Sequence, residues 1–168
     1  MAISHISVER FSVTSSKAFQ EVVAGIEARI GRPEIRKFVA DVAASQTESE
    51  LEKVVHEAVG PSDLMEFIRF DIGDILRKEL GERAPRSLRL VAGNPLIMKQ
   101  MVKFVPDAGS YAPVTILIDE RSDGVHLSYD RMASLLAPYG SAEAIEVARA
   151  LDSKVETLLR AAAASSAP

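Results

Sequence analysis

The strongest constraint on the fold is the hairpin signal Ser122-Asp123-Gly124, which joins two segments of alternating polarity. Residues 114–120 place only apolar side chains on one side and a mixed set on the other, and residues 125–130 alternate again beyond the turn. Alternation with a period of two is typical of strands with one buried face, and glycine accepts the left-handed backbone that tight turns need. The sequence therefore predicts an antiparallel strand pair over residues 114–130.

A second constraint is the turn Gly93-Asn94-Pro95, which follows a strand pattern over residues 87–92. Glycine can end the strand by taking a positive φ, asparagine can cap a helix, and proline suits the first helical position. We expect a short helix over residues 95–104. Because few of its side chains are polar, this helix should be largely buried.

The other segments alternate between strand and helix patterns. We expect a first strand over residues 3–13, a helix capped by Ser15 or Ser16, and a strand over residues 65–71 followed by a short helix that Gly81 ends. A long helix should begin after Ser141. Two further helical patterns lie in residues 33–60, where Thr47-Glu48-Ser49-Glu50 is a capping box.

These elements predict the α+β class: one compact domain over residues 1–160, with a mainly antiparallel sheet packed by helices. A chain of 168 residues is long enough to bury one core. Residues 33–60 should form a helical-hairpin insertion attached to that domain. The Ala/Ser-rich residues 161–168 should form a disordered tail.

Composition excludes several classes of protein. The net charge is −4, and no run of Lys or Arg occurs, so we expect no nucleic-acid partner. The chain has no cysteine, which excludes disulfides and thiolate metal sites. Residues 1–10 lack the apolar segment of a signal peptide, and no spanning helix is evident, so we expect a cytoplasmic protein without a membrane partner.

The best candidate site is the turn Gly93-Asn94-Pro95, because a helix start offers free N–H groups to a polar ligand. The alternative is a turn and cap with a purely structural role. Met98, one helical turn further on, would add an apolar wall. Four methionines could either line a soft apolar pocket or fill gaps in an ordinary core: Met65, Met98, Met101 and Met132.

His126 and Tyr129 complete the candidate ligand-binding set. Their separation of three residues places them on opposite faces of one strand. His126 could act as a general base or a metal ligand, or it could be structural. We expect no metal centre, because His5, His56 and His126 show no ligand spacing.

The order and spacing of several motifs resemble the DUF302 family, also called TT1751-like. The motifs are Leu90-Val91-Ala92-Gly93-Asn94-Pro95, Met98, Asp123-Gly124 and Ser128-Tyr129. The resemblance covers most of the chain except residues 33 to about 60. It implies a compact α+β fold that is often dimeric, in a family whose function is unknown.

No nucleophile–base pair is evident, and no cofactor class is indicated. The leading hypothesis is therefore a homodimeric domain that binds a small ligand or a partner. Pairing is expected from the resemblance and from the apolar character of residues 95–104 and 114–120. The alternative is a small enzyme that uses His126 or Asp71 as a general base in a pocket near Asn94.

Overall fold

The computed structural model describes residue 3 and residues 5–164. Its centre is a five-stranded sheet in the order β1-β5-β4-β3-β2, and every neighbouring pair is antiparallel. The predicted hairpin is confirmed as β4 and β5. The strands are β1 (Arg10–Ser15), β2 (Met65–Asp71), β3 (Ser87–Gly93), β4 (Val114–Arg121) and β5 (Gly124–Asp130).

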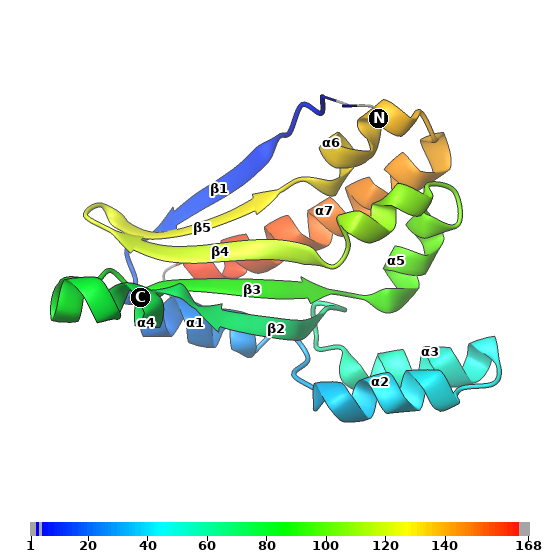
Figure 1. Cartoon of the computed structure of the whole chain (residues 1–168), viewed down its shortest axis with the longest axis horizontal. Helices are drawn as coiled ribbons and strands as arrows, with labels where there is room; N and C mark the ends of the chain where they lie inside the picture. Colours follow the sequence, from blue (N-terminus) through cyan, green and yellow to red (C-terminus); the bar gives the residue numbers. More distant parts are fainter. Residues whose placement is uncertain (1–2, 4, 165–168) are drawn as a thin grey trace.

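Helices α1 and α7 lie together behind the sheet, as Figure 1 shows. The helices are α1 (Phe19–Glu27), α2 (Ile35–Ala44), α3 (Glu48–Ala58), α4 (Ile72–Leu80), α5 (Pro95–Val102), α6 (Met132–Leu136) and α7 (Ala142–Ala163), with short 3₁₀ turns at Gly81–Arg83, Pro106–Ser110 and Ala137–Tyr139. The predicted class, a compact α+β domain with an antiparallel sheet, is confirmed.

The two faces of the sheet differ sharply. On the covered face, Leu90, Ile116 and Leu127 are fully buried in the main core beneath α1 and α7. On the opposite face, Thr14, Arg89 and Thr115 are exposed. We call this second side the open face. A half-solvated antiparallel sheet of this kind accounts for the alternation in the sequence.

The start of the chain differs from the prediction. Strand β1 begins at Arg10 rather than near Ile3, and part of the expected segment lies outside the described residues. Helix α1 is not capped by Ser15, because it begins at Phe19 with Ala18 at the N-cap position. The buried Ser15 hydroxyl donates to the carbonyl of Ala163 at 2.8 Å and accepts from the N–H of Lys17 at 3.2 Å. Instead, the Glu21 carboxylate accepts from the N–H of Ala18 at 3.0 Å.

Helix α5 is less buried than expected. It ends at Val102, and Met101 is its only fully buried residue. Phe104, just beyond it, is exposed. The helix lies at one end of the sheet (Figure 1), where it contacts α7, the 3₁₀ turn Pro106–Ser110 and, more weakly, α3. Its apolar character therefore did not indicate burial on all sides.

Helices α2 and α3 form the predicted hairpin and have an apolar cluster of their own around Phe38, Val55 and Met65. At its base, the N–H groups of Gly31 and Gly60 both donate to the carbonyl of Leu64, at 2.8 and 2.9 Å. That the domain folds without this hairpin stays a prediction. A cooperative melt after a short linker joins Gly31 to Ser62 would support it, and collapse of the fold would refute it.

The C-terminal helix extends further than expected. Helix α7 continues to Ala163, and Ala162 and Ala163 are buried. The first part of the expected tail is therefore helical, while residues 165–168 lie outside the described residues. Over the described part of the chain, no helix combines the length and apolar composition that crossing a bilayer requires.

Candidate functional site

The turn Gly93-Asn94-Pro95 borders a cavity of about 260 Å³ at the end of the sheet, next to α5 and α7. We call it the turn cavity. Nearly all of its lining is apolar: Phe67, Gly93, Asn94, Pro95, Met98, Met101, Ala112, Pro113, Val114 and Leu151. Of the five expected ligand-binding residues, the structure brings Gly93, Asn94 and Met98 together here.

Asn94 begins helix α5 as predicted. Its Oδ1 accepts from the N–H of Leu96 at 2.8 Å, and Pro95 occupies the first helical turn. Its Nδ2 donates to both the backbone carbonyl and the Oδ1 of Asp63, at 3.1 and 3.0 Å. Asp63 has a φ of 60°, a left-handed conformation that is uncommon outside glycine. Asn94 therefore joins the turn to the loop before β2.

These contacts use both the acceptor and the donor capacity of the Asn94 side chain. The residue is only 6% exposed. The polar atoms of its amide are thus already paired within the protein. Asn94 therefore contributes little polar surface to the cavity. The turn cavity is consequently suited to an apolar molecule rather than to a charged one.

Gly93 is required by close packing rather than by its φ angle. It is not among the described residues with positive φ. A Cβ at this position would lie 3.0 Å from the Cβ of Pro113, closer than most real Cβ contacts, so Pro113 would have to shift. Glycine therefore allows β3 to pass close to the start of β4, and a larger side chain would fill the mouth of the cavity.

Of the four methionines, two line a pocket and two fill gaps in a core, the two roles that the sequence left open. Met98 and Met101 line the turn cavity. Met65 belongs to the cluster of the helical hairpin, and Met132 is fully buried in the main core. Both interpretations of the methionine pattern thus apply, each to different residues.

His126 lies on the open face and does not line the turn cavity. Its Nε2 is 2.8 Å from the Oδ1 of Asp123, and its Nδ1 is 3.5 Å from the hydroxyl of Thr14. The hydrogen bond from His126 lowers the pKa of Asp123. The first contact joins β5 to the turn of its own hairpin, and the second reaches across to β1.

Tyr129 lies on the covered face, opposite His126 as predicted. Its hydroxyl donates to the carboxylate of Asp152, which is completely buried on α7. Burial, and secondly the Asp152 hydrogen bond, raises the pKa of Tyr129. Asp152 also accepts from the N–H groups of Met132 and Ala133, at 2.7 and 3.1 Å. The group therefore caps α6 and holds α7 against the sheet.

Asp71 is the N-cap of α4, where its Oδ1 accepts from the N–H of Asp74 at 2.8 Å. In the sheet it pairs with Leu88, whereas Met65 at the other end of β2 pairs with Gly93. Asp71 is thus at the opposite end of the strand from the turn cavity. Within the described residues, no group of three or more His, Asp or Glu side chains is arranged to hold a metal ion.

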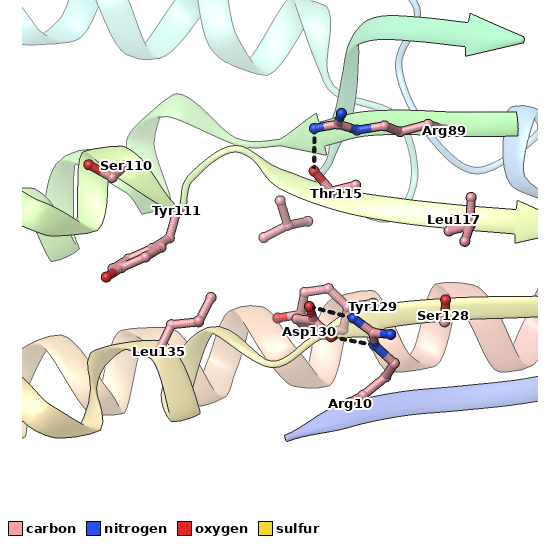
Figure 2. Close-up of a pocket in the computed structure, with 11 residues that line it drawn as sticks. Arg10, Arg89, Ser110, Tyr111, Thr115, Leu117, Ser128, Tyr129, Asp130 and Leu135 are labelled. Atoms are coloured by element: carbon pink, nitrogen blue, oxygen red, sulfur yellow. Dashed lines mark hydrogen bonds and ion pairs between the residues drawn. The ribbon is translucent and has the colours of Figure 1, made fainter. Parts of the chain in front are cut away.

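A second cavity, of about 390 Å³, lies on the open face. We call it the sheet-face pocket, and Figure 2 shows it. Its lining combines charged, hydroxyl and apolar side chains: Arg10, Arg89, Ser110, Tyr111, Val114, Thr115, Leu117, Ser128, Tyr129, Asp130 and Leu135. Sequence reasoning missed this pocket except for Tyr129, since no local motif marks it.

The fold described above defines a small α+β protein with one helix-covered and one open sheet face. Residues 40–162 match the model of the family described as "Domain of unknown function DUF302". Because this match covers most of the chain, the protein belongs to the DUF302 family, as the motifs indicated. The match also includes α3, which the motif resemblance did not.

A solved structure supports the same fold. The crystal structure of an uncharacterized conserved protein DUF302 from Bacillus stearothermophilus superposes with a TM-score of 0.62. The match covers 91% of this chain and 97% of that chain, at 10% sequence identity. At this identity, the likeness concerns the fold alone. A search of curated proteins finds no match.

Proposed function

We propose that this protein binds a small, uncharged, largely apolar molecule in the turn cavity. The observation that carries the proposal is the contrast within the lining: several apolar side chains surround one polar residue, Asn94, whose amide is already paired. Transfer of an apolar ligand from water into this cavity is favourable, whereas a charged ligand would lose its hydration without compensating hydrogen bonds.

The size of the cavity limits the ligand. Its volume of about 260 Å³ is slightly below the common range for sites of drug-like molecules, which begins at about 300 Å³. A single ring or a short aliphatic chain therefore suits it best. Met98 is half-buried at the wall, and its flexible side chain can adjust to ligands of different shape.

The geometry favours binding over catalysis at this cavity. The alternative function required His126 or Asp71 as a general base near Asn94. His126 does not line the turn cavity, and Asp71 caps α4 at the far end of β2. Neither side chain is within reach of a molecule held beside Asn94.

Toluene is a suitable probe, because it is uncharged and fits a single-ring cavity. In an NMR titration, toluene should shift the amide signals of Gly93, Met98 and Leu151 until they saturate. Met98→Trp should abolish these shifts by filling the cavity, while Met98→Leu should retain them because it keeps the apolar wall. Saturable shifts that persist in Met98→Trp would contradict the proposal. Native mass spectrometry of the purified protein would reveal a retained ligand.

We also propose that the protein is a cytoplasmic homodimer and has no nucleic-acid partner. Its acidic charge and lack of cysteine support the location and the absent partner. Support for pairing comes from β2, an edge strand. Gly31 occupies its outer edge at Met65 and Glu66, and the backbone groups beyond Glu66 can pair with a second copy. Four exposed apolar side chains, each between 40% and 67% exposed, lie on it or on α4: Ile68, Phe70, Ile75 and Leu80.

The dimer can be tested by light scattering. The chain mass is 18.2 kDa, so we expect twice this mass in solution. Phe70→Glu should produce the monomer by placing a charge at the proposed interface. Phe104→Glu is the matched control, since Phe104 is equally exposed but lies after α5. A native protein of monomer mass would contradict the proposal.

A further inference from the structure

The sheet-face pocket is built by strand register. One row across the open face runs from Ser12 on β1 through Ser128 and Leu117 to Arg89 on β3, according to the pairing of the strands. Figure 2 shows Arg10 and Arg89 at opposite sides of the pocket, with Leu117 and Ser128 between them. Residues far apart in the sequence are thereby placed around one hollow.

Arg89 differs from the other arginines of the sheet. Arg10 forms two hydrogen bonds with the Asp130 carboxylate, at 2.6 and 2.9 Å. Arg69 pairs with Glu66 and Glu27, and Arg121 with Asp119. Within the described strands, only Arg89 has no carboxylate partner. Its one hydrogen bond is to the hydroxyl of Thr115, at the long distance of 3.5 Å.

The charges of the pocket therefore leave one positive group unbalanced. Arg10 and Asp130 neutralise each other, and their contact raises the pKa of Arg10 and lowers that of Asp130. Arg89 keeps most of the donors of its planar guanidinium free. A guanidinium matches a carboxylate through two parallel hydrogen bonds.

The rest of the lining indicates the remainder of the ligand. Thr115 and Ser128 place hydroxyl groups on the floor of the pocket, where they can donate to a ligand oxygen. Leu117, Leu135 and Val114 add apolar surface. His and Glu are absent from the lining, and Asp130 is engaged with Arg10, so the pocket holds no free general base.

We propose that the sheet-face pocket binds a small monoanionic organic carboxylate. Arg89 receives the carboxylate, the hydroxyls of Thr115 and Ser128 complete its hydrogen bonds, and the apolar part of the ligand lies against Leu117. This site is distinct from the turn cavity, with which it shares only Val114 in its lining, and it does not depend on the function proposed there.

Benzoate is the probe, and the full-length protein is titrated by NMR. Saturable shifts are expected at the amides of Arg89, Thr115, Leu117 and Ser128. Arg89→Gln should weaken binding at least about tenfold, since a hydrogen-bonded charge is removed. Arg89→Lys should lose less because it keeps the charge. Arg121→Gln is the matched control: it removes a strand arginine outside the pocket and should leave binding unchanged.

Two analogues of benzoate, one neutral and one with a phosphate group, test whether the pocket recognises the carboxylate. Benzyl alcohol should bind at least about tenfold more weakly than benzoate, because it lacks the anion. Phenyl phosphate should not be preferred. The proposal is overturned if benzoate causes no saturable shifts at about 20 mM, if Arg89→Gln binds it unchanged, if benzyl alcohol binds equally well, or if phenyl phosphate binds more than tenfold more tightly.

Discussion

The two faces of the sheet are formed by the same strands, but their polar side chains are paired differently. On the covered face, the polar residue Asp152 is completely buried and fully engaged by Tyr129 and the backbone of α6. On the open face, Arg89 is exposed and lacks an acidic partner among the described residues. A satisfied polar group serves stability, whereas an unsatisfied one is available to a ligand.

This difference predicts where substitutions will act. Changes on the covered face should alter the free energy of unfolding, because they create cavities or leave buried polar groups unpaired. Changes on the open face should alter ligand binding and leave the fold intact. The turn cavity lies between these extremes: its lining belongs partly to the core, and its interior is the proposed apolar site.

The largest effect is expected at Asp152. Asp152→Ala removes the acceptor for Tyr129, Met132 and Ala133, and should lower the free energy of unfolding by roughly 3–5 kcal/mol. Glu146→Ala, an exposed change on the same helix, should alter it by less than about 0.5 kcal/mol. Urea denaturation measures both. Equal effects would remove the distinction between the two faces.

Two leucines on adjacent strands give the next contrast. Leu90 is fully buried on the covered face, and Leu117 is half-buried on the open face. Leu90→Ala should lower the free energy of unfolding by about 2–5 kcal/mol through the cavity that it leaves. Leu117→Ala should cost less than half as much. If Leu117→Ala proves equally destabilising, the open face is more tightly packed than we describe.

Asn94→Asp should have an intermediate effect. The change retains the oxygen that caps α5, but it removes both donors to Asp63 and adds a negative charge beside that residue. We expect a loss of about 1–3 kcal/mol at neutral pH. Asn94→Ser keeps a capping oxygen without the added charge and should lose less. A thermal melt unchanged in Asn94→Asp would contradict the structural role of the amide.

The smallest effect concerns the ion pair of Arg10 and Asp130. Arg10 lowers the pKa of Asp130 through its hydrogen bonds, so this contribution is present above the unfolded pKa of about 4 and is lost as the pH falls through the lowered value. Because both groups are well exposed, Arg10→Met should cost less than about 1 kcal/mol at neutral pH. The difference should vanish in acid. Arg89→Gln, which breaks no ion pair, should show no such dependence.

Local signals predicted the parts of the structure that depend on few neighbouring residues. The Asp123-Gly124 hairpin, the Asn94 cap and the Thr47 capping box all follow from short motifs and are confirmed. Other features depend on tertiary contacts between residues far apart in the sequence, and these were not predicted. Ser15 caps no helix because α1 begins only at Phe19, and its hydroxyl instead donates to Ala163 near the other end of the chain.

The candidate site residues likewise divide into those that are neighbours in the sequence and those whose grouping depends on tertiary contacts. Gly93, Asn94 and Met98 adjoin in the sequence, and the structure places them at one cavity. His126 and Tyr129 do not join them, because they lie on opposite faces of β5. The sheet-face pocket could not be predicted, since it depends on the register that places Arg89 beside Leu117 and Leu117 beside Ser128. Alternation predicts which face a residue occupies, but not its neighbours across the sheet.

The most direct test titrates toluene and benzoate separately into the native protein, Met98→Trp and Arg89→Gln, with NMR shifts as the readout. In the native protein, toluene should shift Gly93 and Leu151 at the turn cavity, and benzoate should shift Thr115 and Ser128 at the open face. Met98→Trp should abolish only the toluene response, and Arg89→Gln only the benzoate response. Both probes binding at one place, or either substitution removing both responses, would contradict the separation of the turn cavity from the sheet-face pocket.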